Sequence, residues 1–156
     1  MIYTPETKKA MKLCFEAHRD QVDKSGLPYV FHPFHLAEQM PDEATAVTAL
    51  PHDVMEDTDY TQEDLRAMGF SDEVMEALLL MTHDDAVPYL EYVENLSHNR
   101  IARTVKMADL RHNSDLTRLD RIDEKAIKRV EKYRAAYRIL EEAERQEREA
   151  PGSGKE

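Results

Sequence analysis

The sequence predicts an all-α protein, and three observations support this fold class. The chain of 156 residues contains only four glycines and no tryptophan, whereas alanine, leucine, methionine and glutamate, which favour helices, are common. Apolar residues recur at helical spacing, most clearly at Ala126, Val130, Tyr133 and Tyr137. Short breaks rich in glycine or proline separate the periodic segments. We therefore expect a bundle of about eight helices.

The length and charge of the chain set its broad class. We expect a single domain over residues 1–145, which is long enough to bury a sizeable core, and a disordered polar tail over residues 146–156. The formal net charge of -11 argues against nucleic acid or an anionic membrane as the main partner. An anionic small substrate stays possible if basic groups or a metal gather at its site. Composition carries no signal for the oligomeric state.

The single cysteine and the N-terminus both indicate a cytoplasmic protein. Cys14 lies among apolar neighbours in a predicted helix, so we interpret it as a buried core residue in a reducing compartment. The first residues lack a basic segment followed by an apolar run, and no stretch reaches the length needed to cross a bilayer. We expect a cytoplasmic location.

Start and stop signals divide the chain into eight predicted helices. They cover about residues 5–23, 33–40, 42–49, 61–69, 71–81, 87–97, 99–113 and 123–145.

Capping residues and prolines predict where the first three helices begin and end. Thr4 caps the first, with Pro5 in its first turn, and the loop over residues 24–28 ends it. The second starts near Pro33 and stops before Pro41. The third runs from about Asp42 toward His52, but Pro51 lacks a backbone donor and crowds the preceding turn, so we expect a kink or a fresh helix start at His52.

Similar signals define the later helices. Thr61 opens a short helix that Gly69 ends, and Ser71 caps the next one. Residues 82–85, Thr-His-Asp-Asp, are expected to form a turn rather than a second functional His-Asp pair. The last helix begins after Asp123 and presents a long apolar stripe.

Residues 50–58, Leu-Pro-His-Asp-Val-Met-Glu-Asp-Thr, combine one imidazole with three carboxylates. On a helix, His52 would share a face with Glu56, and Asp53 would share one with Glu56 and Asp57. Burying these acids together is unfavourable unless a cation lies among them. A divalent metal with His and Asp ligands would satisfy them and leave an acid free to take a proton from water. A solvated acidic helix face is the alternative.

Two further segments offer ligands for such a site. His32 precedes Pro33 at a helix entry, where a structural hydrogen-bonding role is the alternative to metal binding. Asp109 lies in a mostly apolar helical segment and shares a face with Lys106 and Asn113. A buried acid needs a partner, so Asp109 implies a metal or a lysine nearby.

Together these residues form the pattern H…HD…D, and the sequence resembles the HD-domain metal-dependent phosphohydrolases. More narrowly, three ordered motifs resemble the hydrolase domain of the RelA/SpoT homologues, most of all the stand-alone small alarmone hydrolases. The motifs are residues 24–33 (Lys-Ser-Gly-Leu-Pro-Tyr-Val-Phe-His-Pro), 52–58 (His-Asp-Val-Met-Glu-Asp-Thr), and 105–109 (Val-Lys-Met-Ala-Asp) followed by His112-Asn113. The resemblance covers roughly residues 7–140 and implies an HD-domain helical bundle.

The resemblance also implies an activity and its residues. It implies a divalent metal, usually Mn²⁺, and hydrolysis of the alarmones guanosine tetra- and pentaphosphate, (p)ppGpp, to GDP or GTP and pyrophosphate in the stringent response. The metal ligands would be His32, His52, Asp53 and Asp109, with Glu56 and Asp57 serving the attacking water. Lys24 and Ser25 would lie in a nucleotide-binding loop and Asn113 near the ribose. Lys106 is a further candidate substrate contact, and Tyr29 is either a base-stacking residue or an interior tyrosine with a bonded hydroxyl.

Several positions depart from this family pattern. Asp23 stands where a basic residue is common, and Arg111 is displaced by one position from the family's Asp-Arg-Leu-His-Asn run. An anion facing phosphates would weaken nucleotide binding. Two alternatives therefore stay open: an HD phosphohydrolase acting on a different nucleotide (a nucleoside phosphate, an adenosine alarmone or NADPH), or a non-catalytic nucleotide-binding module.

Overall fold

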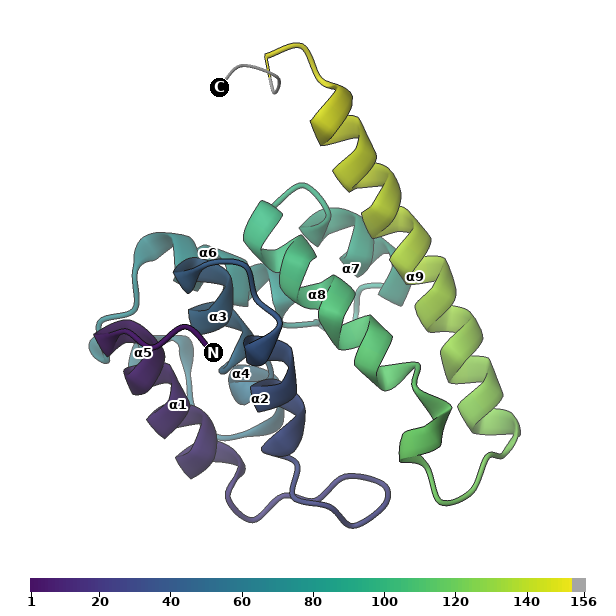
Figure 1. Ribbon diagram of the computed structural model, residues 1–156, viewed down its shortest axis with the longest axis horizontal. Helices are drawn as coiled ribbons and strands as arrows, with labels where there is room; N and C mark the ends of the chain where they lie inside the picture. The colour runs from purple at the N-terminus through teal and green to yellow at the C-terminus, as the bar shows by residue number, and fades with distance from the viewer. Residues whose placement is uncertain (153–156) are drawn as a thin grey trace.

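The computed structural model describes residues 1–152, and the regular elements of this part of the chain are all helices, as predicted (Figure 1). Its elements are α1 (Pro5–His18), α2 (Phe31–Glu38), α3 (Glu43–Ala49), α4 (Val54–Asp57), α5 (Gln62–Ala67), α6 (Asp72–Met81), α7 (Tyr89–Leu96), α8 (Arg100–Asn113), the 3-10 turn η1 (Leu116–Arg118) and α9 (Glu124–Glu149). Residues 1–152 thus contain nine α-helices where about eight were expected, because α4 is a separate short helix.

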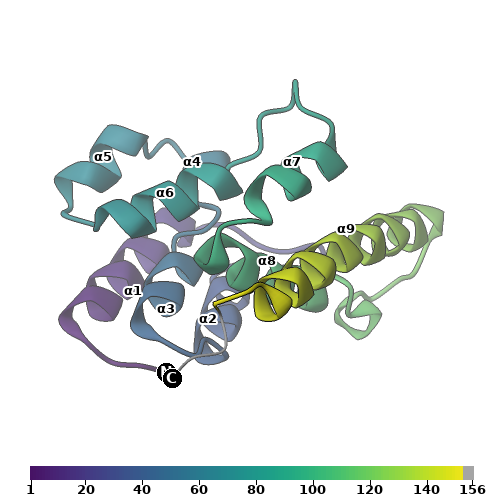
Figure 2. The ribbon, with the colours of Figure 1, turned by 90° about the horizontal axis from the view of Figure 1, so that it is seen from above.

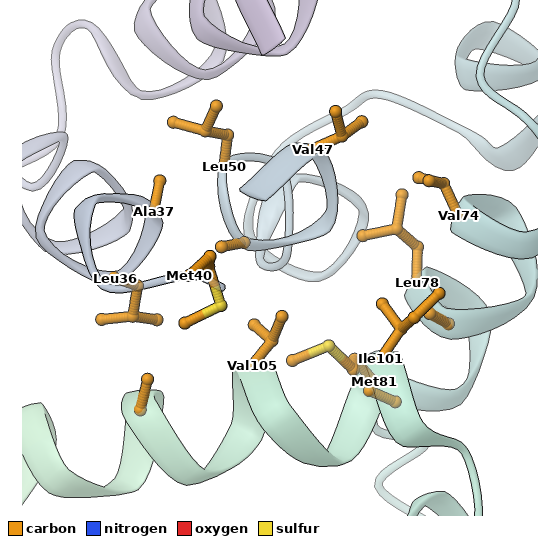
Figure 3. Close-up of a cluster of buried hydrophobic side chains, with 14 of the residues drawn as sticks. Leu36, Ala37, Met40, Val47, Leu50, Val74, Leu78, Met81, Ile101 and Val105 are labelled. Atoms are coloured by element: carbon orange, nitrogen blue, oxygen red, sulfur yellow. The ribbon is translucent and has the colours of Figure 1, made fainter. Parts of the chain in front are cut away.

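Helix α8 lies at the centre and packs against α2, α3, α6 and α9. Figures 1 and 2 show α9 running antiparallel to α8 along one side, with α1 to α3 on the other side of α8. The core between them is apolar and includes Leu36, Leu50, Leu78 and Val105, all fully buried (Figure 3). Burial of this apolar surface is the main force that brings the helices together.

Two helix boundaries near the N-terminus differ from the prediction, and a third is as predicted. Helix α1 ends at His18, several residues early, because residues 19–30 form an ordered loop closed by a bridge between Val22 and Pro28. Helix α2 begins at Phe31, which places Pro33 in the first turn, where its missing N–H is harmless. Helix α3 ends at Ala49 and α4 starts afresh at Val54, so the predicted break is confirmed.

The last helix is longer than predicted. Helix α9 continues to Glu149, so residues 146–149 are helical rather than part of a disordered tail. Ion pairs at helical spacing support the extension, since Arg145 contacts Glu149 at 2.8 Å and Arg148 lies 3.7 Å from Glu144. The expected disorder of residues 153–156 falls outside the described residues.

Two smaller expectations can be compared with the fold. Cys14 is fully buried, as predicted. Among residues 1–152, none of the helices combines the length and the apolar character required to span a bilayer.

Candidate metal centre

Three segments far apart in the sequence bring their polar side chains together beside α8. His32 comes from α2, His52 from the turn before α4, and Asp109 from α8. One ligand atom from each of these residues lies within 4.8 Å of those of the other two, and all three residues are buried. Asp53 joins the group through its Oδ2 atom, which lies 3.1 Å from His52 Nε2. The four predicted metal ligands therefore converge on one place.

His52 is oriented with one ring nitrogen turned toward the carboxylates. Its Nδ1 atom lies 2.7 Å from the carbonyl oxygen of Ala49, which fixes this nitrogen as the donor. Its Nε2 atom is buried and faces two carboxylates, 3.1 Å from Asp53 Oδ2 and 3.6 Å from Asp109 Oδ1, without a well-formed hydrogen bond to any described residue. Metal-binding histidines commonly donate one ring N–H to a carbonyl oxygen in this way, which leaves the lone pair of the other ring nitrogen for the metal.

Asp109 lies at the centre of the polar group. Its Oδ1 atom accepts a hydrogen bond from Asn113 Nδ2 at 2.8 Å and lies 2.9 Å from His32 Nε2. Its Oδ2 atom accepts from Lys106 Nζ at 2.8 Å. Burial alone would raise the pKa of Asp109, but the charge of Lys106 and the hydrogen bond to His32 outweigh burial and hold that pKa well below its usual value. Lys106 and Asn113, both predicted substrate contacts, therefore also support the candidate ligand Asp109.

His112 orients the third predicted ligand. Its Nδ1 atom shares a hydrogen bond of 2.7 Å with His32 Nδ1, and the two rings are stacked with their centres 5.0 Å apart. Burial, followed by the charges of Arg118 and His32, lowers the pKa of His112 to about 4, so this ring is neutral near pH 7. His32 thus presents Nε2 to the carboxylates.

The acids of α4 form a second group beside the first. Carboxylate oxygens of Asp53, Glu56 and Asp57 lie within 4.8 Å of one another, and the side chains of Glu56 and Asp57 are exposed. Burial raises the pKa of Glu56, as do the charges of Asp53 and Asp57, whereas a hydrogen bond from the His83 amide opposes the shift. The pKa of Asp57 is raised for the same two reasons, partial burial and the charge of Asp53. Both acids are thereby better proton acceptors near neutral pH than ordinary carboxylates.

One expectation about this segment was wrong. His52 and Asp53 lie in a turn and not on a helix, because Pro51 interrupts the helical hydrogen bonds. Asp53 still groups with Glu56 and Asp57, as the helical spacing predicted. His52 groups with His32 and Asp109 instead.

Tyr29 connects the loop to the candidate metal ligands. Its hydroxyl donates a hydrogen bond to Asp53 Oδ2. Burial, and then the charge of Asp53, raise the pKa of Tyr29 above its usual range, so the hydroxyl keeps its proton. The structure therefore agrees with an interior tyrosine whose hydroxyl is bonded, while its ring also lines a cavity on the loop side.

Two neighbouring cavities open onto this site. The first, which we call the metal cavity, has a volume of about 290 Å³. Its lining includes candidate ligands, Glu56 of α4, His83 of the segment after α6, and polar or aromatic residues of α7, α8 and α9. These residues are His52, Asp53, Glu56, His83, Tyr89, Tyr92, Lys106, Asp109, Asn113, Lys132 and Tyr133. The second, the loop cavity, has a volume of about 320 Å³ and lies between residues 22–29, residues 113–119 and α9. Asn113 and Tyr133 line both cavities, so the two are adjacent.

The loop cavity explains the departure at Asp23. Asp23 Oδ1 accepts hydrogen bonds from the backbone N–H groups of Ser25 (2.8 Å) and Leu27 (3.0 Å). Asp23 Oδ2 lies 3.9 Å from Arg118 Nη2. The side chain thus serves as the cap of its own loop, and its charge faces a guanidinium. Lys24 lines this cavity, whereas Ser25 donates a hydrogen bond to the carbonyl oxygen of Arg118 at 2.7 Å and anchors the loop.

Sequence reasoning did not identify several residues of the metal cavity. Tyr133 was assigned only to the apolar stripe of the last helix, and Lys132 and Tyr89 were assigned no role. His83 was expected in a turn, and its backbone N–H indeed donates to Glu56 at 2.7 Å from the segment after α6. The helical register of α9 could have placed Lys132 beside Tyr133, but only tertiary packing shows that both face the cavity.

The residues present fit a divalent cation. Two imidazoles and two carboxylates form a mixed nitrogen and oxygen donor set, and the buried Nε2 atom of His52 faces the carboxylates of Asp53 and Asp109. Burial lowers the pKa of His52, but the carboxylates of Asp53 and Asp109 outweigh burial and raise it well above its usual value. A position that attracts a proton so strongly also attracts a metal ion.

Comparison with known proteins finds relatives with related names. No protein-family model matches the chain. It is 35% identical over 117 residues to the guanosine-3′,5′-bis(diphosphate) 3′-pyrophosphohydrolase of Danio rerio, covering 66% of this chain and 64% of that protein. It is also 31% identical over 141 residues to a GTP pyrophosphokinase of Myxococcus xanthus, covering 79% of this chain and 18% of that enzyme.

A solved structure agrees with these relatives over almost the whole chain. The structure of a metazoan SpoT orthologue that hydrolyses ppGpp superposes with a TM-score of 0.68 at 25% identity and covers 94% of this chain and 97% of that one. The chain spans only 10% of the pyrophosphohydrolase of Aquifex aeolicus, to which it is 38% identical over 68 residues. The sequence matches and the shared fold together show that the chain is similar to RelA/SpoT-type hydrolase domains.

Proposed function

We propose that this protein is a Mn²⁺-dependent pyrophosphohydrolase that removes the 3′-diphosphate of (p)ppGpp. The observation that carries the proposal is the buried group of His32, His52 and Asp109, in which His52 Nε2 faces the carboxylates of Asp53 and Asp109, beside the exposed acids of α4. The named activities of the Danio rerio relative and of the structural neighbour support this substrate.

The reaction is a hydrolysis at phosphorus. Water attacks the phosphorus that carries the ribose 3′ oxygen, the bond from that phosphorus to the 3′ oxygen breaks, and the products are pyrophosphate and a nucleotide with a free 3′-hydroxyl. A divalent cation held by His32, His52, Asp53 and Asp109 would lower the pKa of the attacking water and neutralise charge on the phosphate oxygens.

The residues of this chain serve the proton transfers and the positioning. Glu56, with its raised pKa, accepts the proton of the attacking water, and Asp57 supports the proton transfers next to it. Tyr29 holds Asp53 through its hydroxyl. In the loop cavity, Lys24 contributes positive charge for the nucleotide, and Asn113 lies where the two cavities meet.

Incubation of the purified protein with Mn²⁺ and ppGpp tests the proposal. We expect GDP and pyrophosphate in equal amounts, measured by anion-exchange chromatography. His52→Ala and Asp53→Ala should each abolish the reaction, whereas His98→Ala, an exposed histidine outside both cavities, should leave it unchanged. Activity that survives either ligand substitution would overturn the proposal.

A nucleotide panel tests the alternatives in the same assay. Turnover of a nucleoside phosphate, an adenosine alarmone or NADPH, but not of ppGpp, would assign the protein to a different nucleotide. Binding of nucleotides without any turnover would indicate a non-catalytic module. Replacing Mn²⁺ by Mg²⁺ or Zn²⁺ in parallel tests the metal.

A further inference from the structure

The wall of the metal cavity that α7 and α9 contribute carries groups that the proposed chemistry leaves unused. Lys132 of α9 and Tyr89 of α7 line this cavity together with Lys106. Lys132 Nζ lies 4.6 Å from the centre of the Tyr89 ring, and Lys106 Nζ lies 5.9 Å from the same centre. Two ammonium groups and a phenol are therefore gathered on one wall, beside the candidate ligands.

The charge of Lys132 is not neutralised within residues 1–152. Its ammonium group makes cation–π contacts with Tyr89 and Tyr133 but no ion pair in this part of the chain. The positions three and four residues away on α9 are Lys128, Arg129, Ala135 and Ala136, so no acid lies on its stripe of the helix. Lys106, in contrast, is already paired with Asp109. Lys132 is thus the lysine of this wall that is free to attract an anion.

The hydroxyl of Tyr89 is also unused. It is buried and makes no hydrogen bond with any described residue. Burial raises the pKa of Tyr89 to about 12, although Lys106 opposes the shift, so the hydroxyl keeps its proton at neutral pH. A buried donor without a partner is unfavourable unless a ligand accepts from it. The hydroxyl and the Lys132 ammonium group can serve one anionic ligand together.

We propose that Lys132 and Tyr89 hold the terminal phosphate of a diphosphate whose other phosphorus lies at the candidate metal ligands, and that they thereby select diphosphate over monophosphate esters. The cavity of about 290 Å³ has room for such a group, since this volume corresponds to about ten water molecules. The position of the reacting phosphorus rests on the proposed function. The selection by Lys132 and Tyr89 is a separate property of the cavity wall.

Calorimetric titration with inorganic pyrophosphate tests this proposal on the whole Mn²⁺-loaded chain, with orthophosphate as the second probe. Wild-type protein should bind pyrophosphate more tightly than orthophosphate. Lys132→Met and Tyr89→Phe should each weaken pyrophosphate binding about tenfold, which corresponds to the loss of one charge-assisted hydrogen bond. Lys128→Met removes the same charge one turn away on α9, outside both cavities, and should bind both probes as the wild type does.

Tyr89→Phe also separates binding from folding. Because the removed hydroxyl has no partner, the melting temperature of this variant should stay the same or rise while its affinity for pyrophosphate falls. Unchanged pyrophosphate affinity in both variants, or an equal loss for orthophosphate, would overturn the proposal. Binding is measured without turnover, so pyrophosphate selectivity in a protein inactive on the nucleotide panel would refute the proposed hydrolysis alone.

Discussion

The metal cavity and the loop cavity are built in different ways. In the metal cavity the candidate ligands His32, His52 and Asp109 are each at most 4% exposed and are carried by segments that pack in the core. In the loop cavity the charged groups Asp23 and Arg118 are 19% and 26% exposed at the side chain and belong to a loop and a 3-10 turn. The first cavity therefore depends on the packing of the whole molecule, and the second depends on local hydrogen bonds.

This difference indicates which parts of the protein tolerate substitutions. A substitution among the buried candidate ligands leaves an unpaired charge in the core, so it affects folding and chemistry together. A substitution in the loop can be compensated locally, as Asp23 shows by capping the amides of its own loop. Asp23, which departs from the family pattern, lines the loop cavity, whereas the proposed metal ligands match the pattern.

The largest expected effect is at the metal cavity. Asp109→Ala should abolish metal binding and activity and reduce the free energy of unfolding by about 3–5 kcal/mol, because Lys106 would be left buried without its partner. Metal content by mass spectrometry and urea denaturation measure the two losses. Asp115→Asn removes an acid from the loop cavity and should retain the metal. Retention of the metal by Asp109→Ala would refute this assignment.

Glu56→Gln should lower kcat about 100-fold and yet raise the melting temperature at neutral pH. The variant loses a proton acceptor, which accounts for the rate. The folded-state pKa of Glu56 is raised, so its charged form destabilises the folded protein at a pH above that pKa. This destabilisation disappears as the pH falls through the folded-state pKa and the carboxyl group takes up a proton. Wild-type activity should therefore decline with falling pH at a higher pH than an ordinary glutamate would cause. Calorimetric melting measures the expected rise in melting temperature, and a pH profile of kcat measures the expected loss of activity. A lower melting temperature for Glu56→Gln would contradict the raised pKa of Glu56.

Tyr29→Phe tests the connection between the two cavities. The variant loses the hydrogen bond to Asp53, and we expect metal affinity to fall about tenfold, as for other groups that orient a ligand. Competition with a metal-binding dye measures the affinity. Tyr60→Phe, outside both cavities, is the matched control. Equal metal affinity in the two variants would mean that the cavities are independent.

The smallest expected effect is at Asp23. Asp23→Ala should raise KM about fivefold, because the loop loses the acceptor for two backbone N–H groups, while kcat stays near the wild-type value. Asp23→Asn keeps an acceptor oxygen and should change KM little. If the charge of Asp23 repels the substrate instead, both variants would lower KM. Steady-state kinetics on the substrate found with the nucleotide panel separate the two outcomes.

Much of the fold could be predicted from local signals. Thr4, Asp42, Thr61, Ser71, Asn99 and Asp123 each cap the helix that follows, and Pro51 separates α3 from α4. The end of α1 at His18 and the extension of α9 to Glu149 could not be predicted in the same way. The first depends on a bridge within the following loop. The extension of α9 is accompanied by a hydrogen bond that Arg103 of α8 donates to Glu147, and this contact joins distant parts of the chain.

By itself, the sequence determined the helical class and the residue types of the candidate metal centre. Helix caps and apolar spacing are local properties, and the pattern H…HD…D follows from the order of residue types along the chain. Only the tertiary structure decided that His52 points toward Asp109, that Asp23 caps its own loop, and that Lys132 and Tyr89 share a cavity wall. The positions of His52, Lys132 and Tyr89 depend on how the segments that carry them pack, and a helix register alone does not state which partner its face will meet. The Asp23 cap depends on the folded conformation of its own loop.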